Sequence, residues 1–298
     1  LWGWSWLTLG ITLGSWWAYR ELGWGGFWFW DPVENASLMP WLVLTAIIHQ
    51  TACKSVSGKI GLLFLGATGF ITTLLGTFLV RSGIVVSVHA FAVDPLRGQY
   101  ILLLLTAVAI PAYTLWARKY ARLVVCCQQE TELPRKERWL QTQTAIMLGM
   151  LLVIVVATLY PLWVELVWGS KISVGPGYFE QVLAPLVWGL FYAMGAEQLE
   201  KAPCNAVWYA RSCAAGACIL TGALVWWMMQ VFGQSASIVT TITCFFAIWA
   251  TLPLLAMGSN RFSGKHLAHG MVIAILACVV LSKSFEKSQI YTIHPGAK

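Results

Sequence analysis

Charged side chains are scarce in this sequence. Only 10% of its 298 residues are Asp, Glu, Lys or Arg, while 58% are hydrophobic and the mean hydropathy is +0.70. A typical soluble domain is about 25% charged and about 45–50% apolar, and a globule of this size cannot bury so large an apolar fraction. These figures exclude a water-soluble globule, a disordered chain and a small disulfide scaffold. They indicate an integral membrane protein.

Several chemical motifs are also missing. None of the eight cysteines belongs to a CxxC pair, so thiol–disulfide exchange and zinc binding lack support. Nothing resembles a nucleophile with its general base, and we assign no catalytic side chain. The alternating period of a barrel strand is absent, so each membrane span must be an α-helix. The sequence predicts an all-α, polytopic integral membrane helical bundle.

Nine hydrophobic segments are long enough to cross a membrane. A hydrocarbon core about 30 Å thick needs a helix of about 20 mostly apolar residues. The segments lie near residues 1–19, 38–53, 60–80, 99–117, 143–160, 181–197, 212–230, 237–257 and 267–283. No connecting loop is long enough for a separate domain, so we expect residues 1–298 to form a single transmembrane domain.

The distribution of Lys and Arg predicts the orientation of the bundle. Twelve of the 19 basic residues fall in one set of alternate loops and seven in the other. The richer set marks the cytoplasmic side, where residues 118–142 form the main loop, and the segment 20–37 then faces outward. Positive loops on one side account for the net charge of +7 without a nucleic-acid partner.

The beginning of the sequence does not look like a natural N-terminus. Residue 1 is Leu, no basic region or signal-peptide cleavage site follows, and the chain starts inside a hydrophobic span. We expect the sequence to be a piece of a longer polypeptide.

Tryptophan, by contrast, is abundant, with 18 residues. The outward segment contains the compact run Trp24-Gly-Gly-Phe-Trp-Phe-Trp-Asp-Pro-Val-Glu-Asn. Its glycines let the backbone approach a ligand closely, and its aromatic rings present flat apolar faces. Two interpretations remain open: an aromatic belt at the lipid headgroups, or a platform for a planar hydrophobic ligand such as a porphyrin or a quinone.

The end of the same run predicts the start of a helix. Asp31 suits an N-cap, Pro32 suits the first helical turn, and Glu34 completes a capping box. Proton transfer is the alternative role for the two carboxylates.

Two of the five histidines lie inside apolar spans. His49 is well down the second span toward the cytoplasm, and His269 begins the last span near the same side. Intramembrane ionisable residues are rare and usually functional. Two neutral imidazoles at similar depth can supply both axial ligands of a b-type haem. The alternative for each is a hydrogen-bonded packing residue.

A third histidine, His89, lies in the outward loop 81–98, on the same side as the aromatic run. It can therefore ligate a molecule that rests on an aromatic platform, and a plain surface histidine is the alternative. Arg81 and Arg97 flank the loop and are candidate partners for haem propionates, since guanidinium groups pair well with carboxylates.

These motifs together resemble a known family. The run from Trp24 to Trp41 resembles the WWD motif of haem-handling proteins. With Gly76-Thr-Phe-Leu-Val-Arg-Ser-Gly and Val88-His-Ala-Phe-Ala-Val-Asp-Pro, it is similar to the CcmF/NrfE family of cytochrome c-type biogenesis proteins. Lys171-Ile-Ser-Val-Gly-Pro-Gly-Tyr-Phe and Leu267-Ala-His-Gly match later parts of that family, so the resemblance covers essentially the whole chain.

The resemblance implies a haem lyase subunit of cytochrome c maturation in the bacterial inner membrane. Members of the family receive haem from a periplasmic haem chaperone and promote its thioether attachment to apocytochrome c, with other maturation subunits as partners. The WWD segment, residues 20–37, is then periplasmic and holds the substrate haem. The implied haem-contacting residues are Trp24, Gly25, Gly26, Trp28, Trp30 and Asp31.

The resemblance also implies the iron ligands. His89 matches an external axial ligand of the substrate haem, while His49 and His269 match the axial pair of a permanent transmembrane haem b that receives electrons from quinol. The family's second external histidine lies upstream of the WWD segment and has no counterpart here, so we expect the chain alone to lack a complete external site and activity. A transmembrane haem transporter and a b-haem electron-transfer subunit are the alternative functions.

Overall fold

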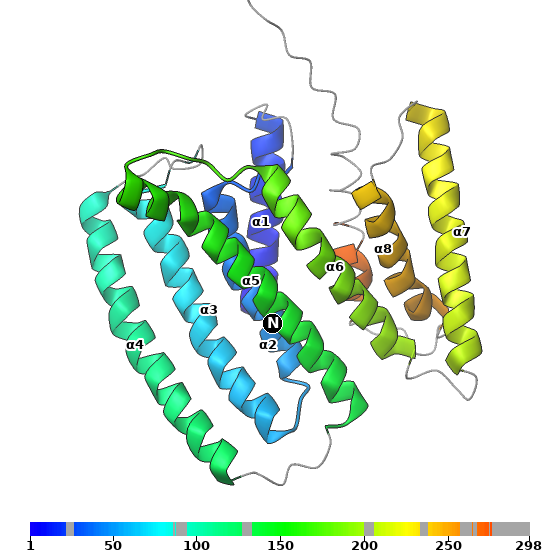
Figure 1. The fold of residues 1–298 in the computed structure, drawn as a ribbon, viewed down its shortest axis with the longest axis horizontal. Coiled ribbons are helices and arrows are strands. Elements are labelled where there is room, and N and C mark those ends of the chain that lie inside the picture. Colours follow the sequence, from blue (N-terminus) through cyan, green and yellow to red (C-terminus); the bar gives the residue numbers. More distant parts are fainter. Residues whose placement is uncertain are drawn as a thin grey trace, which may run out of the picture.

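The computed structural model describes residues 1–21, 27–85, 87, 94–126, 133–199, 206–232, 238–256, 264, 267–273 and 275. Within these residues every regular element is an α-helix, which confirms the predicted all-α bundle (Figure 1). The helices are α1 (Trp2–Glu21), α2 (Pro32–Gln50), α3 (Val56–Ser82), α4 (Pro95–Cys126), α5 (Arg135–Trp168), α6 (Pro176–Leu199), α7 (Ala206–Phe232) and α8 (Ile238–Ala256). A further helical stretch covers residues 267–273.

The helices coincide with the predicted spans, but most are longer. Helices α4 and α5 continue into the predicted loop 118–142, because a helix can extend past the point where its apolar run ends. Four of the described helices, α3 to α6, contain stretches long and apolar enough to cross a membrane. Of the ninth predicted span, 267–283, only residues 267–273 and 275 are described. The sidedness of the bundle stays a prediction.

Helix α2 begins at the capping box that the sequence predicts. The Asp31 carboxylate accepts a hydrogen bond from the Val33 N–H at 2.9 Å, and Glu34 Oε2 accepts one from the Asp31 N–H at 3.0 Å. These bonds satisfy donors that the first turn of a helix otherwise leaves without partners. The helix therefore starts at Pro32, ahead of the predicted apolar span that begins near residue 38.

The largest buried cluster surrounds α2. It joins residues of α2, α3, α5 and α6, and its most buried members include Met39, Val43, Leu65, Ile154 and Phe179, each exposed by 1% or less. In Figure 1, α5 crosses in front of α2 and α3, and α4 lies on the outer side of α3. Helix α2 thus lies at the centre of the first half of the bundle.

Two close contacts fix the neighbours of α2. At Gly76 of α3, a Cβ atom would lie 2.8 Å from the carbonyl oxygen of Ala36, so only glycine permits this approach. On the other side, α1 packs through stacked rings of Trp4 and Trp41, whose centroids are 6.1 Å apart. The Trp4 Nε1–H also donates to Thr45 Oγ1 at 2.9 Å.

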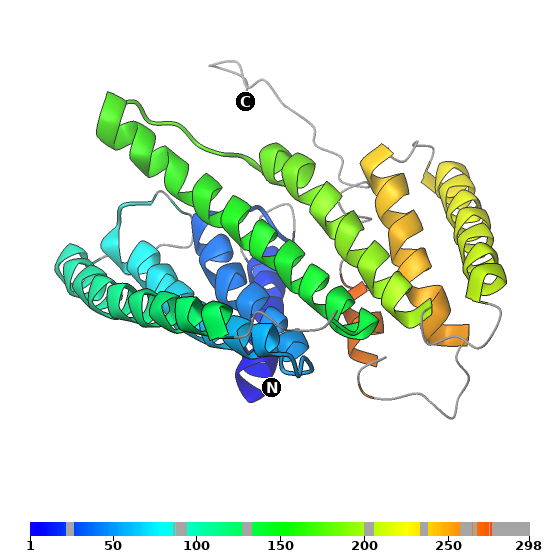
Figure 2. The same cartoon turned by 60° about the horizontal axis from the view of Figure 1, so that its bottom comes forward.

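The second half of the bundle is built on α6 and α8. Phe191 of α6 packs with Ala247 and Ala250 of α8 and with Ile273 of the last helical stretch. Helix α7 packs on α8 and lies at the outer edge of the molecule, away from α1 to α5 (Figure 2). The contact of Ile273 with both helices brings the stretch 267–273, and so His269, to the interior of the bundle.

Candidate functional site

The candidate residues that the structure describes gather at the two ends of α2. Trp28, Trp30 and Asp31 immediately precede the helix, and His49 lies in its last turn. A helix of 19 residues is about 28 Å long, which is close to the thickness of a hydrocarbon core of about 30 Å. We call the two groups the aromatic end and the histidine end.

The aromatic end is organised by Trp30. Its ring stacks on Phe179 of α6 with centroids 4.9 Å apart and planes 6° apart, while Trp28 meets it edge-on at 6.1 Å. Trp30 has φ = 58° and is the only described non-glycine residue with a positive φ. This left-handed conformation costs a bulky residue about 1–3 kcal/mol and persists only where the surroundings enforce it.

Two side chains of α2 hold the backbone around Trp30. Glu34 Oε2 accepts the N–H groups of Phe29 at 2.9 Å and of Asp31 at 3.0 Å, so this carboxylate fixes the residues on both sides of Trp30. Asn35 Nδ2 donates to the Trp30 carbonyl at 3.2 Å and to Thr158 Oγ1 of α5 at 3.1 Å. Asn35 is 1% exposed, so these bonds are made in the interior.

Asp31 also joins the aromatic end to the loop between α3 and α4. Ser87 Oγ donates to Asp31 Oδ1 at 2.5 Å. At the base of the loop, the Asp94 N–H donates to the Arg81 carbonyl at 2.8 Å, and Asp94 Oδ2 lies 3.1 Å from Arg97 Nε. Of the two predicted propionate partners, Arg97 therefore already pairs with an acid.

Four predicted site residues lie outside the described part of the chain. They are Trp24, Gly25 and Gly26 of the aromatic run and the predicted external ligand His89. Their roles stay predictions.

At the histidine end, the structure brings His49 and His269 together. The ring centroids of His49 and His269 are 5.9 Å apart, with a 56° angle between the planes. His49 Nδ1 lies 2.8 Å from the carbonyl oxygen of Thr45. A carbonyl only accepts, so in the neutral ring Nδ1 carries the proton and Nε2 keeps its lone pair for a metal.

This spacing is close to that of two imidazoles on one metal. When two imidazole rings bind one ion from opposite sides, each metal–nitrogen bond is about 2.0–2.1 Å long. The centroids of the two rings then lie about 6.3 Å apart. A hydrogen bond from the other ring nitrogen to a carbonyl, as at His49, is typical of metal-binding histidines. The described residues contain no group of three or more His, Cys, Asp or Glu side chains suited to a metal ion. Two histidines without further protein ligands are suited to be the axial ligands of a metal whose other ligands belong to a macrocycle such as a porphyrin.

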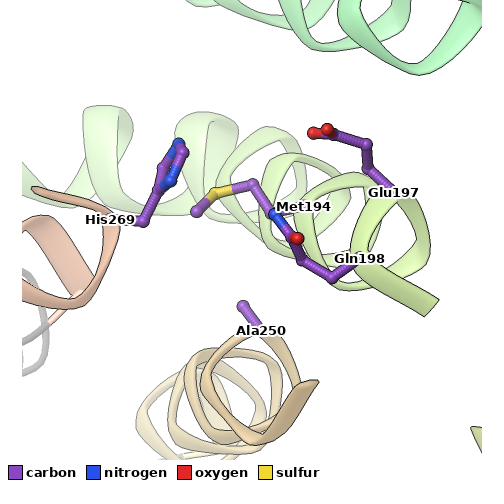
Figure 3. Close-up of a pocket in the computed structure, with 5 residues that line it drawn as sticks. All are labelled: Met194, Glu197, Gln198, Ala250 and His269. Atoms are coloured by element: carbon purple, nitrogen blue, oxygen red, sulfur yellow. The ribbon is translucent and has the colours of Figure 1, made fainter. Parts of the chain in front are cut away.

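Sequence reasoning missed the polar surroundings of this pair. A small pocket is lined by Met194, Glu197 and Gln198 of α6, Ala250 of α8 and His269, and Figure 3 shows Met194 extending toward the histidine. Glu197 is 4% exposed, and its Oε2 accepts a hydrogen bond from Gln143 Nε2 of α5 at 3.4 Å. Gln143 and Glu197 are polar residues near the ends of two predicted spans, and this was the only sign of a polar site in the sequence. Their sequence positions did not show that the two side chains meet.

Comparison with known proteins identifies the family. A family model described as Cytochrome C assembly protein matches residues 1–86. The cytochrome c-type biogenesis protein CcmF of Pseudomonas aeruginosa is 46% identical over 200 residues, 66% of this chain and 30% of that protein. CcmF of Escherichia coli is 36% identical over 296 residues, 97% of this chain and 45% of that protein. This chain belongs to the CcmF family.

The predicted family is thereby confirmed. The probable cytochrome c-type biogenesis protein NrfE of Escherichia coli is also similar, with 43% identity over 185 residues, 61% of this chain and 33% of that protein. The chain spans less than half the length of these relatives. The family model covers the described aromatic end and His49, and stops before His89 and His269. No solved structure matches the chain.

Proposed function

We propose that this chain forms the haem-handling part of a haem lyase subunit that works in cytochrome c maturation. The CcmF relatives are named cytochrome c-type biogenesis proteins. The observation that carries the proposal is the approach of His49 and His269 inside the bundle, with ring centroids 5.9 Å apart. Such a pair is what a bis-histidine haem b requires.

The histidine end is proposed to hold the transmembrane haem b through His49 and His269. When bound, this group supplies one-electron transfer, for which we propose quinol as the electron donor. The bond between His49 Nδ1 and the Thr45 carbonyl supports the assignment, because it directs Nε2 away from the helix backbone. Ala46, about one turn before His49, belongs to the buried cluster around α2.

The aromatic end is proposed to hold the substrate haem at the periplasmic face. Trp28 and Trp30 supply flat apolar surfaces beside Asp31, and we extend the platform to Trp24, Gly25 and Gly26. His89 is the proposed axial ligand, and Arg81 and Arg97 are the proposed propionate partners. Arg97 must exchange its ion pair with Asp94 to serve in this way.

The chemistry assigned to this chain is positioning. In thioether formation, a thiol of apocytochrome c adds across a haem vinyl group: sulfur bonds to one vinyl carbon and a proton goes to the other. The substrate supplies the nucleophile, so the protein contributes by orienting the vinyl group against the thiol. We propose a periplasmic haem chaperone, apocytochrome c and the other maturation subunits as partners, all at the bacterial inner membrane.

A spectroscopic experiment tests the histidine end. The full-length protein is purified from membranes, and its reduced-minus-oxidised spectrum reports bound b-haem. His49→Ala and His269→Ala are each expected to abolish that signal. His266→Ala, three residues before His269, is the matched control and is expected to keep it. Unchanged b-haem in either ligand variant would remove the transmembrane site from the proposal.

A cellular assay tests the aromatic end. Covalent haem on a reporter cytochrome c is measured in cells whose only copy of the protein carries His89→Ala, and we expect maturation to be lost. A b-haem electron-transfer subunit or a haem transporter that does not use this face predicts full maturation, which would contradict the external ligand.

A further inference from the structure

We infer that Gln143 and Thr144 of α5 are positioning residues that set the spacing of His49 and His269. We call these two α5 residues the polar pair. The inference rests on the proposed function, because it concerns the two histidines that we propose as axial ligands of the transmembrane haem b. The polar pair explains how imidazoles from separate parts of the bundle come to lie with centroids 5.9 Å apart.

The two histidines belong to different halves of the bundle, and α5 connects those halves. His49 is in the last turn of α2, which packs on α5. His269 is in the helical stretch 267–273. Ile273 of this stretch packs with Phe191 of α6, and α6 also packs on α5. In Figure 2, α5 runs between α2 and α6. The spacing of the two histidines therefore depends on how α5 holds these two helices.

Thr144 connects α5 to the histidine end of α2. Its hydroxyl donates to Gln50 Oε1 at 3.2 Å, and Gln50 directly follows His49 in the sequence. Gln50 Nε2 in turn donates to the carbonyl of Gly58, in the first turn of α3, at 3.1 Å. Thr144 and Gln50 are both buried. The Gln50 amide thus joins three helices at this end of the bundle.

The contacts of Gln50 restrain the ring of His49. Gly61 of α3 lies directly against the Gln50 amide, because a Cβ on Gly61 would lie 2.8 Å from Gln50 Nε2. The Gln50 carbonyl accepts the Cys53 N–H at 3.0 Å, so its main chain is held as well. His49 Nδ1 is bound to the Thr45 carbonyl one turn earlier. A rotation of the last turn of α2 would therefore turn the imidazole with it.

Gln143, the residue before Thr144, connects α5 to α6. Its Nε2 donates to Glu197 Oε2 at 3.4 Å, and both side chains are buried. Glu197 lines the pocket that also contains His269 (Figure 3). Successive side chains of a helix point about 100° apart. Two neighbouring residues of α5 can therefore reach α2 and α6 at the same level of the bundle.

The chemistry of the polar pair suits a role in fixing geometry. Burying a hydroxyl or an amide is costly unless it is hydrogen-bonded, and Gln143 Oε1 has no hydrogen-bond partner among the described residues. Apolar side chains would hold the helices together without this cost. Directional hydrogen bonds, however, fix the rotation of each helix and specify one arrangement of the core.

EPR spectroscopy of the oxidised full-length protein in detergent tests the inference. The g values of a low-spin bis-histidine haem depend on the angle between the two imidazole planes. Thr144→Val and Gln143→Leu each remove a hydrogen bond with little change in volume, and each is expected to shift the g values. Thr144→Ser keeps the hydroxyl and is expected to restore the parent spectrum.

Thr142→Val and Gln141→Leu are the matched controls. Both residues lie on α5, and their side-chain hydrogen bonds are made at the surface of the protein. The same chemical changes at these positions are expected to keep the parent g values. A shift in the controls as large as that in the polar-pair variants contradicts a specific role for the pair.

The rate at which b-haem passes from the protein to excess apomyoglobin gives the size of the effect. Loss of one buried hydrogen bond is expected to speed this transfer about two- to tenfold in Thr144→Val and in Gln143→Leu. The control variants are expected to release haem at the parent rate.

Hydrogen exchange in the haem-free protein separates positioning from a general loss of stability. The protein is kept free of b-haem by the His269→Ala substitution, and exchange is followed by mass spectrometry. Thr144→Val is expected to speed exchange in a peptide covering residues 44–58, at the end of α2. Gln143→Leu is expected to speed it in a peptide covering residues 190–199, at the end of α6. Equal acceleration of both peptides in both variants contradicts the separate bonds to α2 and α6.

The outcomes distinguish the inference from the proposed function. If His49→Ala and His269→Ala leave b-haem unchanged, the transmembrane site of the proposed function is wrong and the inference fails with it. If these variants lose b-haem, the proposed function stands, and a polar-pair variant with the parent g values and transfer rate overturns the role of that residue. A Thr144→Ser protein that behaves as Thr144→Val also overturns it, because the hydroxyl is present.

Discussion

Replacing Phe179 with Leu tests whether the unusual backbone of Trp30 depends on its neighbour in α6. Phe179 is 1% exposed, and its ring stacks on Trp30 at 4.9 Å with a 6° tilt. Leucine preserves an apolar side chain at this position but removes the aromatic face. The substitution thus separates the effect of stacking from the effect of burial.

The expected cost follows from two contributions. Loss of an aromatic pair costs about 0.5–1.5 kcal/mol beyond the buried area, and a hydrophobic exchange in a packed core usually costs below about 1.5 kcal/mol. Phe179→Leu is therefore expected to lower the free energy of unfolding by about 1–3 kcal/mol. The left-handed conformation of Trp30 costs about 1–3 kcal/mol. Because the lost stacking is of similar size, a sizeable fraction of molecules should leave φ = 58°.

Phe191→Leu provides the control. Phe191 lies on the same helix and is also 1% exposed, but it packs against α8 in the second cluster. Phe191→Leu exchanges one apolar side chain for another in a packed core and is expected to cost below about 1.5 kcal/mol in denaturant unfolding in detergent, so it controls for the change in burial. Hemin binding is measured in proteins that also carry His49→Ala, so that only the proposed external site contributes. Only Phe179→Leu should weaken this binding. The expected loss is about tenfold, which corresponds to about 1.4 kcal/mol, if Trp30 reorients fully. Equal hemin affinity in the two variants would refute the view that Phe179 positions Trp30.

Two further predictions concern the packing of α2, both measured as the unfolding midpoint in detergent. Gly76→Val is expected to destabilise the protein by about 2 kcal/mol or more through overpacking against Ala36. Gly66→Ala is the control and should not destabilise it, because a Cβ at Gly66 meets open space. A Gly76→Val protein as stable as the parent contradicts the close approach. Glu137→Ala is expected to cost about 1–3 kcal/mol, because the Glu137 carboxylate accepts two backbone N–H groups of the loop before α3, at 2.9 and 3.2 Å. Unchanged stability there would mean that water replaces the carboxylate without loss.

The sequence predicted local features well because local rules determine them. The capping box at Asp31 and Glu34 follows from residues three positions apart, and the structure forms it. The helix positions followed from the length of each apolar run, although hydropathy does not show how far a helix extends beyond the hydrocarbon core. The matched depth of His49 and His269 was visible in the sequence, because each occupies a known distance along a span.

Contacts between distant segments could not be predicted in the same way. The stacking of Trp30 on Phe179, the bond from Ser87 to Asp31 and the approach of Gln143 to Glu197 all depend on which helix faces which. Hydrophobic periodicity identifies the face of one helix but not its partner. These contacts nevertheless decide how each end of α2 is organised.

The approach of Gly76 to Ala36 has a consequence for the membrane interior. Pro40 lies within α2, and a proline has no N–H to donate to the carbonyl four residues earlier, which is that of Ala36. The Ala36 carbonyl therefore lacks its usual helical donor, a loss that matters most where no water is present. Gly76 brings a Cα–H close to this oxygen, and such contacts contribute about 0.5–1 kcal/mol. Proline in one helix and glycine in the next thus act as a pair, so α2 and α3 cannot be redesigned independently.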